Sequence, residues 1–458
     1  MPDDLDPATV DAVFKAYDVR GLAPEQITPQ LARATGRAHT QVTGAATVVV
    51  GHDMRPTSPL LAAAFAEGAT EAGADVVMIG LASTDQLYFA SGHLGLPGAM
   101  FTASHNPAAY NGIKMCRADA VPIGMESGLA EIRDLVLTPR PVPGPVGTVS
   151  EQDLLHEYAA FLLSLAPVSG RRLTVVADAG NGMAGHTAPA VFELLGDTVD
   201  LVSMYFELDG TFPNHEANPI EADNLRDLQA RVLVEGADVG LAFDGDADRC
   251  FLVDEKGQAV SPSALTGLIA ERELAKEPGS TVIHNLITSR AVPELVTRLG
   301  GTPVRTRVGH SFIKATMAET DAIFGGEHSG HFYFRDFWRA DSGMLAALHA
   351  LAALAETDVP LSELLAPYDP YPVSGEINSV VDDPQVVMDE VEATYGGQDG
   401  VGIDRLDGLT VAHDDWTFNV RPSNTEPLLR LNAEGRDTDT MTRMRDEVLA
   451  LIRKERHA

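Results

Sequence analysis

The sequence predicts an α/β protein of several domains, with mixed and mostly parallel sheets. Short runs of β-branched residues alternate along the chain with longer runs in which apolar residues recur at helical spacing. This alternation is typical of domains whose parallel strands are joined by helices. The chain has 458 residues, which corresponds to about three domains at roughly 150 residues each. Hydrophobic residues make up 45%, a share that supports packed cores and excludes a disordered or fibrous chain.

The first block of the chain carries a pattern of strand, helix and strand. A β-branched run at 46–51 predicts a buried strand, and apolar residues at helical spacing predict a helix over 58–72. Gly73 stands where helices often end in a left-handed glycine. We expect further strands at 74–81 and 98–102.

The same pattern recurs after proline-rich connections. The segment 137–148 is rich in proline and is typical of a rigid linker. Beyond it, the pattern predicts strands at 171–178, 239–243, 250–253 and 280–284, and helices over 186–195, 291–299 and 438–454. Prolines cluster again at 367–372. We therefore expect four domains, spanning 1–150, 151–253, 254–368 and 369–458.

Charge and cysteine content exclude several classes of protein. Lys and Arg number 33 against 66 Asp and Glu, so the net charge is −33, which disfavours nucleic acid and anionic membranes as partners. Cys116 and Cys250 are too few for a disulfide framework or a thiolate zinc site. The acidic start does not resemble a signal peptide, and the most apolar window, 344–355, is too short to span a bilayer. We expect a cytoplasmic protein.

Two motifs suggest other functions and are weighed against simpler interpretations. The segment 180–185 matches G-x-G-x-x-G, which would suit a dinucleotide-dependent oxidoreductase, but a tight turn between strand and helix needs glycines equally. The segment 244–255 imitates an EF-hand loop, yet Arg249 stands where that loop needs glycine and the flanks are strand-like. No Gly-Lys pair is present, which excludes a Walker A loop.

Three aspartates form the strongest candidate metal site. Asp244, Asp246 and Asp248 alternate along one short segment between two apolar runs, so their side chains converge in an extended or tightly turned loop. Their oxygens suit Mg²⁺ or Ca²⁺ rather than zinc. The simpler alternative is a solvated acidic turn. Arg249, the next residue, could hold a phosphate oxygen beside the metal.

Ser104 is a candidate nucleophile at the end of a predicted strand. It lies in the loop 102–107, where an exposed reactive side chain is commonly placed. His105 follows, but adjacent residues of an extended chain point apart, so we do not expect a Ser-His proton relay. No G-x-S-x-G motif frames the serine. By itself, the loop could be an ordinary serine turn.

Two further loops suit a phosphate and a sugar. In 421–427, Arg421 precedes Ser423, Asn424 and Thr425 in a turn that can bind phosphate, and Arg430 offers a second cation. The segment 326–331, G-E-H-S-G-H, is dense in hydrogen-bonding groups suited to sugar hydroxyls, whereas a metal site there lacks a third ligand. Either loop could also be an ordinary polar loop. Together with the serine and the aspartates, they predict phosphoryl transfer on a sugar.

The chain resembles the α-D-phosphohexomutase family, within it the phosphomannomutase/phosphoglucomutase branch. The motifs that carry this resemblance run in order along nearly the whole chain: Y-D-V-R-G at 17–21, G-H-D-M-R at 51–55, T-A-S-H-N-P at 102–107, Y-N-G-I-K at 110–114, D-G-D-A-D-R at 244–249, G-H-S at 309–311 with Lys314, G-E-H-S-G-H at 326–331 and R-P-S-N-T-E-P at 421–427.

The resemblance implies both an architecture and a reaction. The family has three related α/β domains and a smaller C-terminal α+β domain around a central cleft. It interconverts hexose 6-phosphate and hexose 1-phosphate, here mannose and/or glucose, using Mg²⁺, an active-site phosphoserine and a hexose 1,6-bisphosphate intermediate. The implied partners are therefore small sugar phosphates, and the chain would act as a monomer or a dimer.

The resemblance also implies roles for individual residues. Ser104 would carry the phosphoryl group and, with Asp244, Asp246 and Asp248, would hold Mg²⁺. Lys114 and Arg20 would assist proton transfer and charge stabilisation, with His310 and His331 as further acid/base candidates. The residues expected to contact substrate are Tyr17, Arg249, Arg290, Glu327, Ser329, Arg421, Ser423, Asn424, Thr425 and Arg430.

Three departures from the family pattern leave the substrate preference open. His328 stands where relatives often carry Met or Gln, Ala247 where Gly is common, and Arg290 where some relatives use Lys. Phosphoglucosamine mutase, the close alternative, usually has G-E-Q-S-G-H in the sugar loop. The eukaryotic-type glucomutase loop, G-E-E-S-F-G, is absent from the sequence. A non-catalytic relative would be expected to have lost motifs that are intact here.

Overall fold

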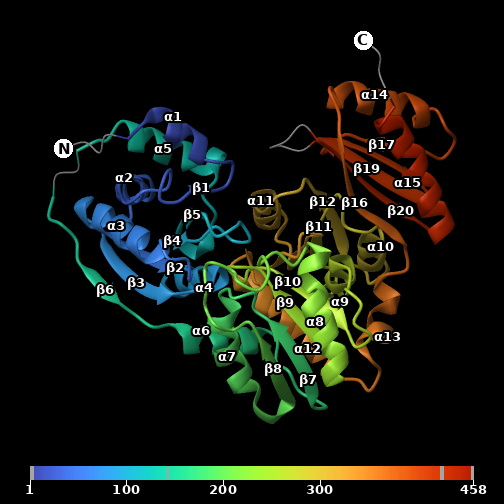
Figure 1. The fold of residues 1–458 in the computed structure, drawn as a ribbon, viewed down its shortest axis with the longest axis horizontal. Helices are drawn as coiled ribbons and strands as arrows, with labels where there is room; N and C mark the ends of the chain where they lie inside the picture. The colour runs from blue at the N-terminus through green and yellow to red at the C-terminus, as the bar shows by residue number, and fades with distance from the viewer. Residues whose placement is uncertain (1–4, 142–143, 423–427, 455–458) are drawn as a thin grey trace. The chain divides into compact units, whose positions relative to one another are not determined.

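The computed structural model describes residues 5–141, 144–422 and 428–454, apart from the side chains of residues 310 and 311. These residues form two compact units (Figure 1). The first unit comprises Met1–Pro262 and Ser329–Leu364, and the second comprises Ser263–His328 and Leu365–Ala458. Each unit is described separately below.

A six-stranded mixed sheet begins the first unit, in the order β1-β5-β4-β2-β3-β6. Its strands are β1 (Val19–Leu22), β2 (Thr47–His52), β3 (Asp75–Leu81), β4 (Gly98–Phe101), β5 (Tyr110–Cys116) and β6 (Val149–Glu151). β2 runs parallel to β3 and β4, and β6 runs parallel to β3, whereas β5 is antiparallel to β1 and β4. The expected strands at 46–51, 74–81 and 98–102 are thereby confirmed within a residue or two.

Among the described residues, five helices accompany this sheet, of which α3 confirms the helix expected over 58–72. They are α1 (Pro7–Val13), α2 (Pro29–Thr43), α3 (Ser58–Glu71), α4 (Thr84–Leu94) and α5 (Leu129–Leu137), with 3-10 turns η1 (Ala118–Ala120) and η2 (Met125–Ser127). The side chains of Asp6, Thr28 and Ser83 cap α1, α2 and α4 by accepting backbone N–H bonds. Gly73 follows α3 with φ +88°, as expected of a helix-ending glycine.

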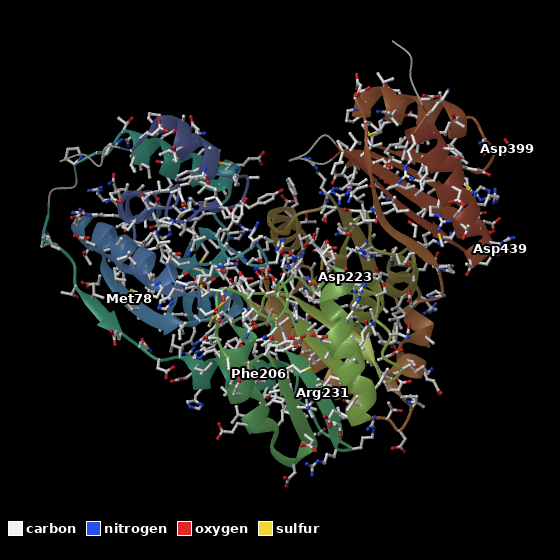
Figure 2. All side chains as sticks on the ribbon, viewed as in Figure 1. Met78, Phe206, Asp223, Arg231, Asp399 and Asp439 are labelled. Carbon is white, nitrogen blue, oxygen red and sulfur yellow. The ribbon has the colours of Figure 1, made fainter. Side chains whose placement is uncertain are left out.

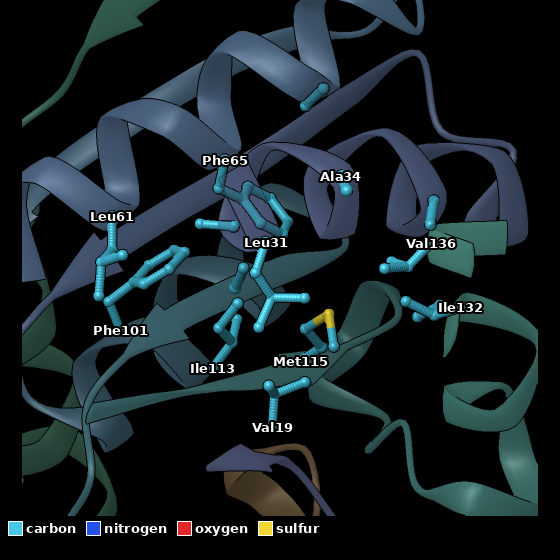
Figure 3. Close-up of a cluster of buried hydrophobic side chains, with 14 of the residues drawn as sticks. Val19, Leu31, Ala34, Leu61, Phe65, Phe101, Ile113, Met115, Ile132 and Val136 are labelled. Carbon is cyan, nitrogen blue, oxygen red and sulfur yellow. The ribbon is translucent and has the colours of Figure 1, made fainter. Parts of the chain in front are cut away.

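A single apolar core joins α2 and α3 to this sheet. Figure 3 shows Leu31 of α2 and Phe65 of α3 pointing towards Phe101 and Ile113 of the strands. The rings of Phe65 and Phe101 meet edge to face, with centroids 5.6 Å apart. This packing fixes the carboxyl end of β4, from which the serine loop departs.

The second sheet of the first unit has four strands in the order β10-β9-β7-β8. They are β7 (Leu173–Asp178), β8 (Val199–Met204), β9 (Val239–Phe243) and β10 (Cys250–Asp254). β7 is parallel to β8 and β9, and β9 and β10 form an antiparallel hairpin in which Phe243 pairs with Cys250. The accompanying helices are α6 (Leu155–Leu165), α7 (Ala184–Leu195) and α8 (Arg226–Glu235), with η3 (Gly196–Thr198) and η4 (Ala222–Leu225). The strand flanks exclude an EF-hand at 244–255.

The remainder of the first unit centres on a buried helix. Its elements are β14 (Phe332–Phe334), η5 (Arg335–Phe337), β15 (Ala340–Asp341), α12 (Gly343–Ala355) and α13 (Leu361–Leu365), the last ending just beyond the unit. Every residue of α12 is buried, and the helix contacts α6 and β10. The most apolar window of the sequence is therefore a core helix.

The second unit contains a parallel α/β part and an antiparallel C-terminal part. The first includes α9 (Pro262–Lys276), β11 (Thr281–Asn285), α10 (Ala291–Arg298), β12 (Thr302–Thr306), α11 (His310–Thr320), β13 (Phe324–Gly326) and η6 (Ala366–Tyr368), with β11 parallel to β12 and β13. The second is an antiparallel sheet in the order β16-β20-β19-β18-β17. Its elements are β16 (Val373–Val380), α14 (Pro384–Tyr395), β17 (Gly402–Asp404), β18 (Leu409–His413), β19 (Trp416–Pro422), β20 (Leu428–Gly435) and α15 (Thr438–Ile452).

These sheets confirm the predicted fold class of α/β domains followed by a smaller α+β domain. The acidic excess lies partly on the surface, where Asp223, Asp399 and Asp439 are exposed (Figure 2). Within the described ranges, the helices are all too short or too polar to cross a lipid bilayer.

Candidate active site

The serine loop leaves the end of β4 with an unusual backbone conformation. Ser104 has φ 51°, in the left-handed region that non-glycine residues seldom occupy. Its side chain is buried, and Oγ donates a hydrogen bond to Oδ2 of Asp244 at 2.8 Å. Its backbone N–H donates to Oγ1 of Thr102 at 2.9 Å. The strained turn therefore directs the hydroxyl towards the loop that carries Asp244, Asp246 and Asp248.

His105 lies closer to the serine than the sequence predicted. The expectation that the two side chains point apart is wrong, since Ser104 Oγ and His105 Nδ1 are 3.2 Å apart. The expectation assumed an extended backbone, and the positive φ of Ser104 removes that premise. Nη2 of Arg249 also lies 2.8 Å from Nδ1. The Arg249 guanidinium and burial hold the pKa of His105 well below its usual value, so the neutral ring can accept from Arg249.

The three predicted aspartates converge in the loop between β9 and β10. Asp244, Asp246 and Asp248 are all buried, and one carboxylate oxygen from each lies within 4.8 Å of the others. Ala247 turns the loop with φ 60°. Because the strands on either side pair with each other, the hairpin holds this turn in place.

A lysine neutralises part of this negative cluster. Nζ of Lys114 lies 2.7 Å from Oδ2 of Asp246 and 2.6 Å from Oδ2 of Asp248. Arg249 Nε adds a longer ion pair to Asp244 at 3.4 Å. Lys114 projects from β5, so the N-terminal sheet supplies a cation to a loop of the second sheet. Two protein cations therefore face three carboxylates, which leaves room for further positive charge.

The carboxylate pKa values reflect this unequal pairing. Burial and the neighbouring Asp246 charge raise the pKa of Asp248 to about 6. Burial and the charges of Asp248 and Asp246 also raise the pKa of Asp244. Burial raises the pKa of Asp246 as well, but its bond to Lys114 outweighs this and gives a net lowering. Asp246 is thus the carboxylate that Lys114 keeps ionised.

The donor set fits a hard divalent cation. Oδ1 of Asp246 and Oδ1 of Asp248 are buried and accept no hydrogen bond from any described residue. Buried carboxylate oxygens that accept no hydrogen bond are costly. A magnesium ion takes carboxylate oxygens as ligands, so these two atoms and the Asp244 carboxylate are suited to hold it.

His331 joins the cluster from the segment before β14. Its Nε2 lies 3.6 Å from Asp248 Oδ1 and 3.8 Å from Asp341 Oδ2, and Arg249 Nε donates to it at 3.2 Å. Ser329 Oγ lies 3.0 Å from its Nδ1. The structure thus places His331 beside the aspartates and Ser329 against the His331 ring.

Arg20 contacts the serine loop at Asn106. Its Nη1 donates to Oδ1 of Asn106 at 2.7 Å, and its Nη2 pairs with Asp18. Tyr17, also predicted to bind substrate, lies half-buried just before β1. Arg20 is therefore placed against the serine loop, in which Asn106 lies.

In the second unit, the side chain of the predicted sugar-binding glutamate is fixed by hydrogen bonds from nearby residues. Glu327 is buried, and its Oε1 accepts from Asn285 Nδ2 at 3.3 Å and from the Gly309 N–H at 3.2 Å. Arg290 pairs with Oε1 of Glu434 at 3.2 Å and donates to the Asp414 carbonyl at 2.7 Å. In this conformation Arg290 contacts the C-terminal domain.

Two predicted phosphate-binding arginines face each other across neighbouring strands. Arg421 of β19 is directly opposite Arg430 of β20. Glu376 of β16 bridges them, with Oε2 3.0 Å from Arg421 Nη2 and Oε1 3.2 Å from Arg430 Nη1. Burial lowers the pKa of His328. The Glu376 charge opposes this lowering of the pKa, and the Arg421 charge adds to it. The other predicted residues of this site, Ser423, Asn424 and Thr425, lie outside the described residues, as does the side chain of His310.

The glycine-rich turn at 180–185 packs against protein. A Cβ at Gly182 would lie 2.7 Å from the Gly245 carbonyl oxygen, and one at Gly185 would lie 2.3 Å from that of Phe206. The Met183 N–H donates to the Gly245 carbonyl at 2.9 Å. The glycines therefore allow close approach of the metal loop and the segment after β8, which supports the simpler interpretation of this motif.

Sequence reasoning missed a second layer of residues behind the aspartates. Thr84 Oγ1 donates to Asp246 Oδ2 at 2.6 Å, and its N–H donates to the Asp246 carbonyl at 2.9 Å. Asp85 is buried and accepts from Ser83, from Tyr158 at 2.7 Å and from Ser342 at 2.6 Å. Nothing in the local pattern at 83–85 distinguishes these residues from an ordinary helix start.

Four family models match the chain in succession. They describe phosphoglucomutase/phosphomannomutase alpha/beta/alpha domain I at residues 11–140, domain II at 156–257, domain III at 261–371 and the C-terminal domain at 376–451. The order and number of these domains agree with the four-domain interpretation of the sequence.

Individual relatives match over nearly their whole length. A phosphomannomutase of Salmonella montevideo is 40% identical over 449 residues, covering 96% of this chain and 98% of that protein. The phosphohexose mutases of Xanthomonas campestris pv. campestris (strain B100) are 40% identical over 448 residues, covering 96% and 99%. A crystal structure of a phosphoglucomutase/phosphomannomutase family protein from Burkholderia thailandensis superposes with a TM-score of 0.89 at 31% identity, covering 99% of each chain.

Proposed function

The chain belongs to the phosphoglucomutase/phosphomannomutase family and is a phosphohexomutase, and we propose that it interconverts hexose 1-phosphate and hexose 6-phosphate through a phosphoserine at Ser104. The sugar is mannose, glucose or both. A hexose 1,6-bisphosphate is the proposed intermediate and activator. We propose the four domain boundaries given above, near residues 150, 254 and 368, which the ranges of the family models support.

The hydrogen bond from Ser104 Oγ to Asp244 is the observation that best supports this mechanism. It joins the proposed phosphoryl carrier to the proposed metal loop at 2.8 Å. A phosphorylated serine needs no strong base, because it then donates its phosphoryl group rather than attacking as a nucleophile. After transfer, the freed hydroxyl is held by the Asp244 carboxylate, which is oriented to accept its proton.

The residues proposed to hold Mg²⁺ are Asp244, Asp246, Asp248 and phosphorylated Ser104. When bound, Mg²⁺ supplies charge neutralisation at the transferring phosphoryl group. A phosphoserine adds about −1.5 to −2 charge, so the two protein cations alone would leave the cluster strongly negative. Arg249 is positioned to contact phosphate, since its Nη2 reaches the His105 ring beside Ser104.

Proton transfer is assigned to the groups around this cluster. Lys114 bridges Asp246 and Asp248 through its ammonium group, and the two carboxylates raise its pKa although burial acts in the opposite direction. It therefore acts as a charged donor that stabilises developing negative charge. His331 and Arg20 are the further candidates, and His310 stays a prediction.

Recognition of the rest of the substrate is assigned to Ser329 and to residues of the second unit. Glu327, Ser329 and Arg290 are proposed to contact the sugar, although Ser329 belongs to the first unit. Arg421 and Arg430, with Ser423, Asn424 and Thr425, are proposed to hold the phosphate that is not reacting. This one phosphate-binding loop can serve both ends of the sugar if the bisphosphate reorients by half a turn in the site between the two half-reactions. A cytoplasmic location and a monomeric or dimeric state remain predictions.

Phosphoglucosamine mutase activity is the alternative within the family. An assay panel distinguishes this activity from that on mannose or glucose phosphate. It contains mannose, glucose and glucosamine 1-phosphates, Mg²⁺ and a trace of hexose 1,6-bisphosphate. We expect turnover of the mannose or glucose phosphate and little of the glucosamine phosphate. Turnover of glucosamine 1-phosphate alone would overturn the proposed substrate, and no turnover of any of the three would overturn the reaction.

A further inference from the structure

Arg55 is a buried arginine whose guanidinium faces four backbone carbonyls, three in the serine loop at 102–107 and one at Tyr110, the first residue of β5. Its Nη2 donates to the carbonyl oxygens of Ser104 at 2.9 Å and Asn106 at 2.7 Å. Its Nη1 donates to those of Pro107 at 2.9 Å and Tyr110 at 3.0 Å. The side chain is fully inaccessible to solvent, so it lies too deep to meet a substrate.

The surroundings of Arg55 fix the guanidinium in this place. Asp53 is equally buried, and its Oδ2 lies 3.2 Å from Arg55 Nε. The other Asp53 oxygen accepts the Arg55 N–H at 2.9 Å and the Ser58 hydroxyl at 2.6 Å. Asn111 in turn donates to Ser58 at 2.9 Å. Burial lowers the pKa of Arg55, but arginine stays protonated in proteins.

A loop of the second sheet covers the guanidinium from the other side. The ring of Phe212 lies over it, with its centroid 5.0 Å from Cζ. Gly210 packs so closely that a Cβ there would lie 2.6 Å from the Arg55 Cα. Both sheets that contribute to the proposed site therefore enclose Arg55.

The contacts of Ser104 show what this arrangement does. Its carbonyl is bound to Arg55, while its hydroxyl is bound to Asp244. Four carbonyl oxygens turned towards one point repel one another unless a cation lies between them. The left-handed φ of Ser104 is itself unfavourable and persists only when its surroundings impose it. Arg55 supplies both the cation and the restraint.

We propose that Arg55 is a positioning residue, which orients Ser104 for phosphoryl transfer by binding the carbonyls of its loop. The proposal rests on the proposed role of Ser104 as phosphoryl carrier. The Arg55 guanidinium binds backbone carbonyls and the Asp53 carboxylate rather than the side-chain atoms proposed to hold Mg²⁺ or the sugar, so we expect it to act on the rate of transfer and not on sugar binding. The planar fork serves two pairs of carbonyls at once, which a lysine ammonium cannot reproduce.

The test compares Arg55→Met and Arg55→Lys with a matched control, Arg171→Met. Arg171 also joins a carbonyl and a carboxylate, donating to Thr357 O at 2.8 Å and Asp238 at 2.7 Å. Arg171 lies before the start of β7, and the glycine-rich turn that packs on the aspartate loop lies after its end. Arg171 is therefore at the end of this strand that is remote from the aspartates. We measure kcat and KM for glucose or mannose 1-phosphate, the thermal midpoint, and the ³¹P NMR signal of the phosphoserine.

We expect Arg55→Met to lower kcat by about 100-fold, the effect of a misplacement near 1 Å, with KM changed by less than about threefold. The phosphoserine ³¹P signal should shift or broaden. Arg55→Lys should lower kcat by about tenfold, since a single ammonium reaches fewer carbonyls. The control should lose thermal stability and retain kcat and the ³¹P signal.

The proposal is overturned if either Arg55 variant keeps kcat within about threefold of the wild type while its thermal midpoint falls. If Arg55→Met does not fold, Arg55→Lys decides the question by the same two readouts. A loss that appears only in KM also overturns it. Failure of the proposed function is separately visible: a phosphate that maps outside 102–107, or full activity of Ser104→Ala, removes the carrier role whatever Arg55 does.

Discussion

Ser104 and Asp244 are 140 residues apart in the sequence and are joined by a hydrogen bond of 2.8 Å. One lies at the end of a strand in the N-terminal sheet, and the other begins the turn of a hairpin in the second sheet. The bond places the hydroxyl of the proposed phosphoryl carrier against a buried carboxylate cluster, next to Lys114 and Arg249. The predictions below test this arrangement and the parts of the protein that support it.

Ser104→Ala should abolish most activity without unfolding the protein, because it removes the proposed phosphoryl carrier and only one buried hydroxyl. Intact mass should show a wild-type fraction heavier by one phosphate, and peptide mapping should place it within 102–107. Ser164→Ala, an exposed serine of α6, is the control and should keep full activity. Unimpaired turnover by Ser104→Ala would contradict the assignment.

Removing divalent metal should stop turnover, and Mg²⁺ should restore it, because the three aspartates offer hard oxygen ligands. Zn²⁺ should substitute poorly, since the three aspartates offer hard carboxylate oxygens. Asp248→Asn should raise the Mg²⁺ concentration needed for half-maximal activity by tenfold or more, by analogy with a lost charged ligand contact of ~1.5–3 kcal/mol. Asp223→Asn, which alters an exposed acid, should leave the magnesium titration unchanged. Full activity in excess chelator would remove the site.

Arg421→Ala should lower kcat/KM in both directions, because one clamp is proposed to hold the non-reacting phosphate in each half-reaction. The loss of a charge-assisted contact of about 1.5–3 kcal/mol corresponds to roughly tenfold to more than a hundredfold. Lysine should rescue only part of this loss. Magnesium affinity should stay the same, because the metal loop belongs to the other unit.

Arg405→Ala is the control for this clamp. Arg405 is an exposed arginine of the same C-terminal part and pairs with Asp389 and Glu392. Its loss should cost little, since surface ion pairs contribute little. Normal kcat/KM in Arg421→Ala, measured with both sugar phosphates, would take the 421–427 loop out of the active site.

The buried Asp85 should make the protein less stable as pH rises. Burial raises the pKa of Asp85 to about 7, although three hydroxyl donors act against this. Unfolded, the carboxyl titrates near 4. Between these values the folded state binds the proton more tightly, so stability falls as pH rises from about 4 to 7. Asp85→Asn does not titrate and should escape this loss.

The measurement is the thermal midpoint of both proteins from pH 4 to pH 8. The midpoint of Asp85→Asn minus that of the wild type should become more positive with rising pH and level off above about pH 7. Any part of the difference that does not change with pH reflects the altered hydrogen bonds to Tyr158 and Ser342, so the test is the change of the difference with pH. A difference that is flat or falls with pH would show that Asp85 is not protonated in the folded state.

Several elements of the fold follow from local sequence, because their signals are local. The β-branched run at 46–51 and the helical spacing at 58–72 correspond to β2 and α3, and Gly73 ends α3 as expected. The convergence of Asp244, Asp246 and Asp248 was also predictable, since it depends on alternation within a single tight turn.

Contacts that span domains could not be predicted in the same way. Whether Lys114 meets Asp246 depends on how two sheets pack, and no pattern near either residue carries that information. The placement of His105 was wrong for a related reason: a positive φ at a serine is set by the surrounding structure, here including Arg55. Glu376 between Arg421 and Arg430 likewise depends on the register of three strands.

By itself, the sequence determined the order of elements, the fold class, the ordered motifs and the chemical types of the site residues, because each depends on short-range periodicity or composition. The tertiary structure decided which carboxylate Lys114 keeps ionised, where the Ser104 hydroxyl points and which arginine holds its loop. These outcomes depend on burial, which makes unpaired charges and carbonyls costly and so selects one set of partners among many.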